Sequence, residues 1–255
     1  VCLTRPHAGP GGKMDRAAIA EMLSGATVRI GDPADPLSLK ADGLAGESFD
    51  GVISCLASRT GRPGDAWSID YGAHMGALAV AKEERIPQFI LLSAICVQKP
   101  RLEFQKAKLA FEKELVNSGL TYSIVRPTAF FKSLSGQLDR VRQGKPFLLF
   151  GDGNLTACKP ISDADLGNYL AECLIDETRH NRVLPIGGPG DAITPLEQGE
   201  TLFELLRLQP RFLHVPVKLL DAAIAIFDLL GRISPASANK AELARIGRYY
   251  ATESM

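Results

Sequence analysis

The stretch Phe89-Ile90-Leu91-Leu92-Ser93 decides the fold class, because it is a continuous apolar run that ends in a small polar residue. A strand of this composition is typical of a parallel sheet whose two faces are both covered by helices. Helical patterns lie on either side of it, over residues 66–85 and residues 102–118. We therefore predict a buried β-strand within a series of alternating strands and helices.

The same alternation extends through the first half of the chain. Further strands are expected at residues 1–3, 27–30, 51–55 and 121–125, and further helices at residues 15–23 and 37–44. This pattern predicts an α/β fold with a doubly wound, parallel, Rossmann-like sheet.

After Pro127 the pattern changes. It predicts a helix at residues 133–143, strands at 147–150 and 183–186, a helix at 163–176 with Ser162 as its N-cap, and mostly helix over 194–252. We assign residues 1–133 and 163–187 to the dinucleotide-binding domain. Residues 134–162 and 188–255 are expected to form a smaller, mostly helical C-terminal cap that binds the substrate.

Composition excludes several classes of protein. The 255 residues carry 29 Lys and Arg against 29 Asp and Glu, so the net charge is zero, which disfavours a nucleic-acid binder. The five cysteines are scattered, without the spacing of a zinc or iron–sulfur site, so no metal is expected. The most apolar stretch, residues 215–234, contains four charged residues, which argues against a transmembrane span.

The N-terminal residues read as the end of a strand and contain no initiator Met. The G-x-G-x-x-G turn that binds a pyrophosphate in this fold is absent, and Gly9, Gly11 and Gly12 follow the first strand in a Pro-rich loop. We expect the first βα unit, with the glycine turn and its helix, to be missing from this sequence.

In an open parallel sheet the ligand binds beyond the carboxyl ends of the strands, so the residues after each strand are candidates. Arg5 follows the first strand, where a basic side chain can bind the 2′-phosphate of NADPH; a plain surface arginine fits equally well. Asp32 follows the second strand and could accept from an adenine amino group, although an Asp before Pro33 also suits a turn.

The next three strand ends supply the remaining cofactor-binding candidates. Small residues after the third strand allow close approach to a ribose or pyrophosphate, or simply tight packing, and the fourth and fifth strand ends face the nicotinamide. The candidates are Leu56, Ala57, Ser58, Ser93, Ala94, Pro127, Thr128 and Phe130.

Lys108 is the catalytic candidate. Many short-chain dehydrogenases carry Tyr-x-x-x-Lys on the helix after the fourth strand, and here the corresponding residues are Phe104 and Lys108. A phenyl ring cannot donate a proton, so ordinary ketone reduction by that route is disfavoured. Lys108 borders the apolar stripe of its helix, which favours contact with the cofactor ribose over a solvated position. Lys106 and Lys113 are expected to face solvent.

The helix expected at residues 215–234 is strongly amphipathic, with Lys218, Asp221, Asp228 and Arg232 along one line. Packing of its apolar side on the core of the cap is the favoured interpretation. The alternative is peripheral association with a membrane or contact with a hydrophobic ligand.

Long runs of the chain resemble a known family. They include Leu91-Leu92-Ser93-Ala94-Ile95-Cys96-Val97-Gln98-Lys99-Pro100, Val125-Arg126-Pro127-Thr128-Ala129-Phe130-Phe131, Leu184-Pro185-Ile186-Gly187-Gly188-Pro189-Gly190 and Ile246-Gly247-Arg248-Tyr249-Tyr250-Ala251. These runs are similar to the NADPH-dependent 8-vinyl reductases of divinyl chlorophyllide, a group of atypical, NmrA-like short-chain dehydrogenases. The resemblance covers residues 55–255.

The resemblance implies that NADPH reduces the 8-vinyl group of a tetrapyrrole substrate, divinyl chlorophyllide or protochlorophyllide, to an ethyl group in chlorophyll or bacteriochlorophyll synthesis. It implies a location in a bacterial cytoplasm or, in a phototrophic eukaryote, a plastid. Ile95, Cys96, Phe130 and Phe131 would then form an apolar wall for the macrocycle, although core packing explains them equally well. Lys108 or water would supply the proton. A non-catalytic NADP(H) sensor and a pigment-assembly protein are the competing hypotheses.

Overall fold

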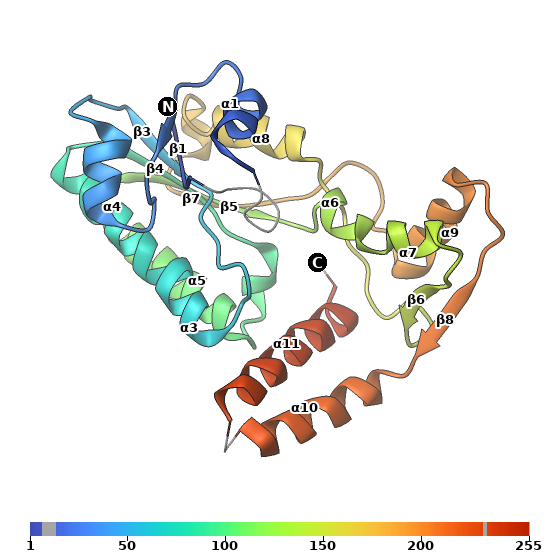
Figure 1. The fold of residues 1–255 in the computed structure, drawn as a ribbon. Coiled ribbons are helices and arrows are strands. Elements are labelled where there is room, and N and C mark those ends of the chain that lie inside the picture. Colours follow the sequence, from blue (N-terminus) through green and yellow to red (C-terminus); the bar gives the residue numbers. More distant parts are fainter. Residues whose placement is uncertain (7–13, 232–233, 255) are drawn as a thin grey trace.

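The computed structural model describes residues 1–6, 14–231 and 234–254, and an α/β sheet covered by helices forms its centre (Figure 1). The predicted central strand is β4 (Gln88–Leu92), which pairs in parallel with its neighbours on both sides. The sheet has the order β3-β4-β5-β7, and its other strands are β3 (Gly51–Ser54), β5 (Thr121–Pro127) and β7 (Arg182–Ile186). The predicted parallel, helix-covered architecture is confirmed.

Helices cover both faces of this sheet, which explains why its central strands are apolar throughout. On one face lie α4 (His74–Glu83) and α5 (Glu103–Val116), which pack with β4 around Phe89 and Phe111. On the other face α8 (Asp163–Glu172) packs with β4 and β5 around Ile90 and Val125. Each of these buried side chains contributes about 1.5–3 kcal/mol of hydrophobic stabilisation.

The first two strands form a separate parallel pair, β1 (Cys2–Thr4) and β2 (Val28–Ile30). Between them runs α1 (Arg16–Met22), whose N-cap Asp15 accepts a hydrogen bond from the backbone N–H of Ala18. Among the described residues, β1 and β3 face each other across a cavity and do not pair. Gly9, Gly11 and Gly12 lie outside the described residues, and the expected glycine turn stays a prediction.

Two helices predicted as regular contain wider π-helical turns. The helix expected at residues 66–85 is α3 (Pro63–Ala66), then a π-helical segment (Trp67–Ala73), then α4. The helix expected at residues 37–44 is α2 (Pro36–Ser38) followed by a second π-helical segment (Leu39–Leu44). A π turn inserts extra backbone and redirects the side chains that follow, which periodicity in a sequence does not reveal.

The remaining elements before residue 200 follow the predictions closely, with shorter helices. The helix expected at residues 133–143 is split into α6 (Phe131–Leu134), a 3₁₀ turn (Ser135–Gln137) and α7 (Leu138–Arg142). The predicted N-cap is confirmed, because the Ser162 hydroxyl accepts a hydrogen bond from the backbone N–H of Asp165.

A second group of elements packs around its own apolar cluster. There β6 (Phe147–Phe150) pairs in parallel with β8 (Phe212–Val215), and α9 (Pro195–Leu205) adds Phe203 to the cluster. The expectation of mostly helix over residues 194–252 is confirmed, with β8 as an exception that pairing with the distant β6 stabilises. The predicted division into two domains stays an interpretation.

The chain ends in two packed helices, α10 (Val217–Gly231) and α11 (Pro235–Thr252) (Figure 1). Asp221 and Asp228 of α10 lie beside α11, where they pair with Arg248 and Arg245. Leu220, Ala223, Ile224 and Phe227 are half-buried and none of the described α10 residues is fully buried, so packing of the apolar side on the cap is only partial. Arg232 lies outside the described residues. No helix among the described residues is long and apolar enough to cross a membrane.

Candidate functional site

The carboxyl ends of β3, β4 and β5 surround a cavity of about 650 Å³, which we call the main cavity. Its volume lies within the usual range for a small-molecule site. Its strand-end lining consists of Cys55, Leu56, Ala57, Leu92, Ser93, Ala94, Ile95, Cys96, Pro127, Thr128, Ala129 and Phe130. We call this lining, together with Lys108 from α5, the floor. The position agrees with the rule that open parallel sheets bind ligands beyond their strand ends.

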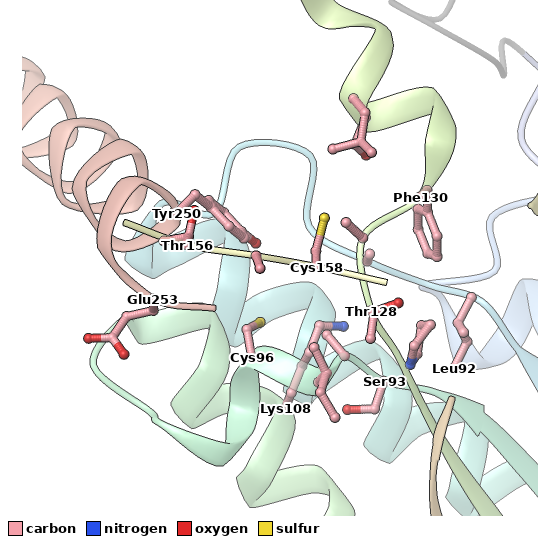
Figure 2. Close-up of a pocket in the computed structure, with 18 of the residues that line it drawn as sticks. Leu92, Ser93, Cys96, Lys108, Thr128, Phe130, Thr156, Cys158, Tyr250 and Glu253 are labelled. Atoms are coloured by element: carbon pink, nitrogen blue, oxygen red, sulfur yellow. The ribbon is translucent and has the colours of Figure 1, made fainter. Parts of the chain in front are cut away.

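Lys108 lies in the floor and is largely buried (Figure 2). Its Nζ lies 2.9 Å from Asp70 Oδ1, and the two side chains are 10% and 0% exposed. Asp70 lies in the π-helical segment before α4, which packs against α5. A buried ammonium without a partner would be strongly destabilising, so Asp70 is what allows a lysine at this position.

The Asp70 carboxylate has further capacity to accept hydrogen bonds. Oδ1 also accepts from the backbone N–H of Ser58 at 3.3 Å, whereas Oδ2 is buried without a partner among the described residues. The nearby His74 is buried against Phe111, and its Nδ1–H donates to the Ile69 carbonyl oxygen at 3.1 Å. Burial, and then the positive charge of Lys108, lowers the pKa of His74 to about 4, so this imidazole is neutral at pH 7.

Ser93 is held by a second buried ion pair next to Lys108. The Ser93 hydroxyl donates to Glu112 Oε1, and Glu112 also receives hydrogen bonds from Arg126 at both of its oxygens. Glu112 lies one helical turn after Lys108 in α5, and Arg126 lies near the end of β5. The pair therefore fixes the end of β4 against the end of β5, directly below the cavity.

Residues from outside the sheet close the main cavity opposite the floor. We call the part contributed by α11 and the residue after it, Tyr250 and Glu253, the roof. Figure 2 shows Tyr250 extending from α11 toward the interior, across from Lys108. A smaller cavity of about 360 Å³ continues beyond Tyr250 and shares it as a wall residue.

The roof is docked on the loop after β4. The Tyr249 hydroxyl donates to the Cys96 carbonyl oxygen at 2.9 Å, and Glu253 pairs with Lys99 and Arg101, at 2.6 Å each. The loop that carries Thr156 and Cys158 completes the wall. It passes so close to the backbone after β7 that a side chain at Gly188 would meet the Pro160 carbonyl oxygen at 2.0 Å.

A third cavity, of about 1030 Å³, lies between β1 and β3. It shares Cys55, Leu56 and Ala57 with the main cavity, so the two adjoin along the strand ends. Arg5, Arg59 and Arg62 are among its lining residues. The Arg5 Nε lies 3.0 Å from Asp32 Oδ1, and a hydrogen bond from the Ala34 N–H together with Arg5 holds the pKa of Asp32 below its ordinary value.

A family model described as NAD(P)H-binding matches residues 13–177. The chain belongs to this NAD(P)H-binding family. The match covers β2 to β5, whose carboxyl ends border the two adjoining cavities.

The relatives of this family member are closely similar over its whole length. It is 50% identical over 263 residues to the protein named divinyl chlorophyllide a 8-vinyl-reductase, chloroplastic, of Arabidopsis thaliana, and 50% identical over 262 residues to the protein of the same name of Cucumis sativus. All of the chain is matched in both, and it spans 63% and 62% of the length of those relatives. The resemblance found in the sequence is thereby confirmed.

Solved structures share the fold at low identity. An NADPH-dependent quinone oxidoreductase of Escherichia coli, complexed with NADPH, superposes with a TM-score of 0.66 over 92% of this chain and 77% of that one, at 17% identity. A UDP-glucose 4-epimerase of Thermotoga maritima gives a TM-score of 0.70 over 84% of this chain and 76% of that one, at 15% identity. Both likenesses support the Rossmann-like architecture of this NAD(P)H-binding chain.

The geometry fits the dinucleotide that the family binds. Two adjoining cavities follow the strand ends, with arginines along one and a buried ammonium in the other. Guanidinium groups suit phosphates, and an ammonium suits ribose hydroxyls. The unpartnered Oδ2 of Asp70 beside Lys108 is a further acceptor for a ligand hydroxyl.

The structure places the predicted site residues in two groups and leaves three aside. Leu56, Ala57, Ser93, Ala94, Ile95, Cys96, Lys108, Pro127, Thr128 and Phe130 line the main cavity, and Arg5 lines the cavity next to it. Asp32 and Ser58 are not among the described lining residues: the Asp32 carboxylate binds Arg5, and the Ser58 backbone binds Asp70. Phe131 is 54% exposed and lies outside the lining, because it begins α6 after the strand has turned away.

Sequence reasoning missed three residues that shape the site: Asp70, Glu112 and Tyr250. Glu112 had a local signal, because it lies four residues after Lys108 on the same face of the helix. Asp70 and Tyr250 had none, since they reach the cavity from segments 38 residues before and 142 residues after Lys108.

Proposed function

We propose that this chain reduces the 8-vinyl group of divinyl chlorophyllide or divinyl protochlorophyllide to an ethyl group, with NADPH as the reductant. The observation that carries the proposal is the main cavity. It is a largely apolar chamber with a buried ammonium in its floor, and it adjoins a cavity suited to a dinucleotide. The whole-length likeness to relatives named as vinyl reductases supplies the substrate class.

When bound, NADPH supplies a hydride. Lys108, held by Asp70, is placed to bind the ribose next to the nicotinamide, and Ser93, held by Glu112, orients a hydroxyl toward the same end of the cavity. Because both side chains are fixed before any ligand binds, they position the reacting groups at little entropic cost. Arg5 is the candidate for the 2′-phosphate and hence for selectivity for NADPH.

The apolar lining suits a flat macrocycle. Ile95, Cys96 and Phe130 present carbon and sulfur atoms to the cavity, and the smaller cavity beyond Tyr250 extends the space available. A vinyl group conjugated with the macrocycle accepts hydride without a carbonyl oxygen that needs protonation. The phenyl ring of Phe104, where many short-chain dehydrogenases have a catalytic tyrosine, is therefore compatible with this reaction.

The alternative is an NADP(H)-binding sensor or pigment-assembly protein without turnover. A fixed ammonium and hydroxyl at the nicotinamide end favour catalysis, because a sensor needs affinity for the dinucleotide and no aligned groups there.

The test is incubation of the protein with divinyl chlorophyllide and either NADPH or NADH, followed by chromatography of the pigments and by the position of the Soret band. We expect a monovinyl product, a blue-shifted Soret band and a clear preference for NADPH. Binding of NADPH without any monovinyl product would reject the reductase and establish the alternative.

We also propose that α10 brings the protein to a membrane surface. Its exposed apolar side chains are contiguous on the helix and comprise Leu219, Ile226, Leu229 and Leu230. Amphipathic helices with such a face bind at the lipid interface. The relatives named above are chloroplastic, so we place the reaction in a plastid or, in a bacterium, in the cytoplasm at a membrane.

Flotation with phosphatidylcholine vesicles tests this placement. Ile226→Glu together with Leu229→Glu should reduce the vesicle-bound fraction, whereas Leu205→Glu, at an even more exposed leucine of α9, should leave it unchanged. Equal binding by all three proteins would rule out α10 as the contact.

A further inference from the structure

A phenol from the far end of the chain reaches the same cavity as Lys108. Tyr250 lies in the last turns of α11, and its side chain extends into the main cavity with the hydroxyl oxygen at the inner end (Figure 2). It is also a wall residue of the smaller cavity that continues beyond it. Tyr250 therefore borders both spaces.

The docking of α11 fixes the position of this ring. The neighbouring Tyr249 binds the Cys96 carbonyl oxygen, and the two rings meet edge to face with centroids 5.8 Å apart. Glu253, one turn later, pairs with Lys99 and Arg101. The Tyr250 hydroxyl is thus carried by an anchored helix and has no hydrogen bond to the backbone that would occupy it among the described residues.

We propose that Tyr250 is the proton donor of the vinyl reduction, an inference that rests on the proposed function. The hydride forms a C–H bond at one vinyl carbon while the C=C π pair moves to the other carbon and the macrocycle. The Tyr250 O–H bond then breaks, its proton forms the second C–H bond, and the phenolate takes a proton back from water. The vinyl group is reduced by two electrons and NADPH is oxidised by two, so the step balances.

The phenol is also protonated at neutral pH. Desolvation raises the pKa of Tyr250 above its ordinary value, although 41% of the residue stays exposed, and the nearby Cys96 acts in the same direction. The hydroxyl is therefore a neutral donor at pH 7, as a general acid must be before it reacts.

The other ionisable groups of the cavity are less suited to this step. Loss of a proton from Lys108 would leave the buried Asp70 carboxylate without its cation. The Glu253 carboxylate is engaged by Lys99 and Arg101 and has no proton to give. The remaining ionisable donors are the thiols of Cys55, Cys96 and Cys158, whose pKa values are all raised by burial, and they form the competing outcome of the test.

Two adjacent tyrosines provide a matched experiment. Tyr250→Phe removes the hydroxyl in the cavity, and Tyr249→Phe removes the hydroxyl that docks the helix. We expect Tyr250→Phe to lower the single-turnover rate of vinyl reduction by about 100-fold, within the usual range for a lost general acid. Its binding of divinyl chlorophyllide, measured by quenching of pigment fluorescence without NADPH, and its melting temperature should stay close to wild type. Tyr249→Phe should show the reverse pattern, with a lower melting temperature and a nearly unchanged rate.

Chemical rescue distinguishes the loss of a proton donor from a change in the shape of the cavity wall. Added phenol should restore part of the rate of Tyr250→Ala, and added benzene of similar size should not. A wild-type rate in Tyr250→Phe, or a rate lost in Cys55→Ala, Cys96→Ala or Cys158→Ala with Tyr250→Phe unaffected, would overturn the assignment. Absence of turnover by the wild type would instead reject the proposed function, and this inference with it.

Discussion

The floor and the roof of the main cavity are held in place by different forces. In the floor, Lys108 and Ser93 are fixed by the buried carboxylates of Asp70 and Glu112. In the roof, α11 is anchored by a Tyr249 hydrogen bond and by Glu253, whose side chain is 10% exposed but whose partners Lys99 and Arg101 are 58% and 61% exposed. Ion pairs with both groups buried are costly to break, whereas pairs whose cations stay in solvent contribute less.

This difference has a consequence for substitutions. In the floor the groups that we propose to position the cofactor also hold α5 against the sheet, so changes there are expected to alter stability and chemistry together. In the roof the hydroxyl in the cavity and the contacts that dock the helix belong to separate residues. Changes there are expected to affect one property at a time.

The largest effect is expected at Lys108. Lys108→Met should lower kcat/KM by about 100-fold or more, as expected for a lost positioning contact at the reacting end. It should also destabilise the fold, because Asp70 keeps a buried charge without a partner. Steady-state kinetics and urea unfolding measure the two effects.

A paired variant separates them. Lys108→Met combined with Asp70→Asn removes both charges and should recover most of the stability while the activity stays lost. Recovery of activity in the double variant would show that Lys108 acts only through the fold.

The next largest effect is expected at Glu112. Glu112→Gln leaves the guanidinium of Arg126 without its carboxylate and should lower the free energy of unfolding by about 3–5 kcal/mol. Glu172→Gln, at the more exposed pair with Arg179, is the control and should cost less than about 1 kcal/mol. Similar losses in the two variants would contradict the contrast between buried and exposed pairs.

The sequence predicts most of the sheet because its signals are local. The run around Phe89 is apolar for its whole length and identifies a strand with helices on both faces, and Ser162 identifies the start of α8. The strand β8 could not be predicted in this way. Its four residues resemble many short apolar segments, and only pairing with the distant β6 makes them a strand. The orientation of α10 could not be predicted either, because the carboxylates of Asp221 and Asp228 face arginines of α11.

The candidate site divides in the same way. Strand-end residues such as Ser93 and Thr128 can be located once the strands are known, because the sheet brings its carboxyl ends together. Lys108 can be located from the stripe of its helix. Asp70 cannot, because a π-helical turn directs its carboxylate inward, and Tyr250 cannot, because the return of α11 to the cavity depends on contacts made late in the chain.

Acid should lower the free energy of unfolding through His74, which lies near Lys108. Its pKa is about 4 in the folded protein and about 6.5 when unfolded, so the unfolded chain binds a proton first as the pH falls. Stability is therefore lost between about pH 6.5 and pH 4, by about 3 kcal/mol at the lower limit. Urea unfolding at pH 7, 5.5 and 4 measures this loss. His74→Asn cannot titrate and should show a flatter profile; a profile as steep as that of the wild type would refute the assignment.

The smallest effect is expected at the anchor of the roof. Glu253→Gln removes the charge that pairs with Lys99 and Arg101, and hydrogen exchange of the α11 amides should accelerate by about two- to five-fold, the range expected for exposed pairs. Exchange in α5 should not change, because its buried pairs are intact.

The hydrogen bond from Lys99 lowers the pKa of Glu253, so the anchor is present at neutral pH and is lost as the pH falls below about 4.5. In the wild type at low pH the α11 amides should then approach the exchange of the variant, after correction for the pH dependence of exchange itself, whereas α5 also loses protection through His74. Equal acceleration in α5 and α11 of the variant would show that the roof and the floor open as one unit, and the comparison drawn between them would then fail.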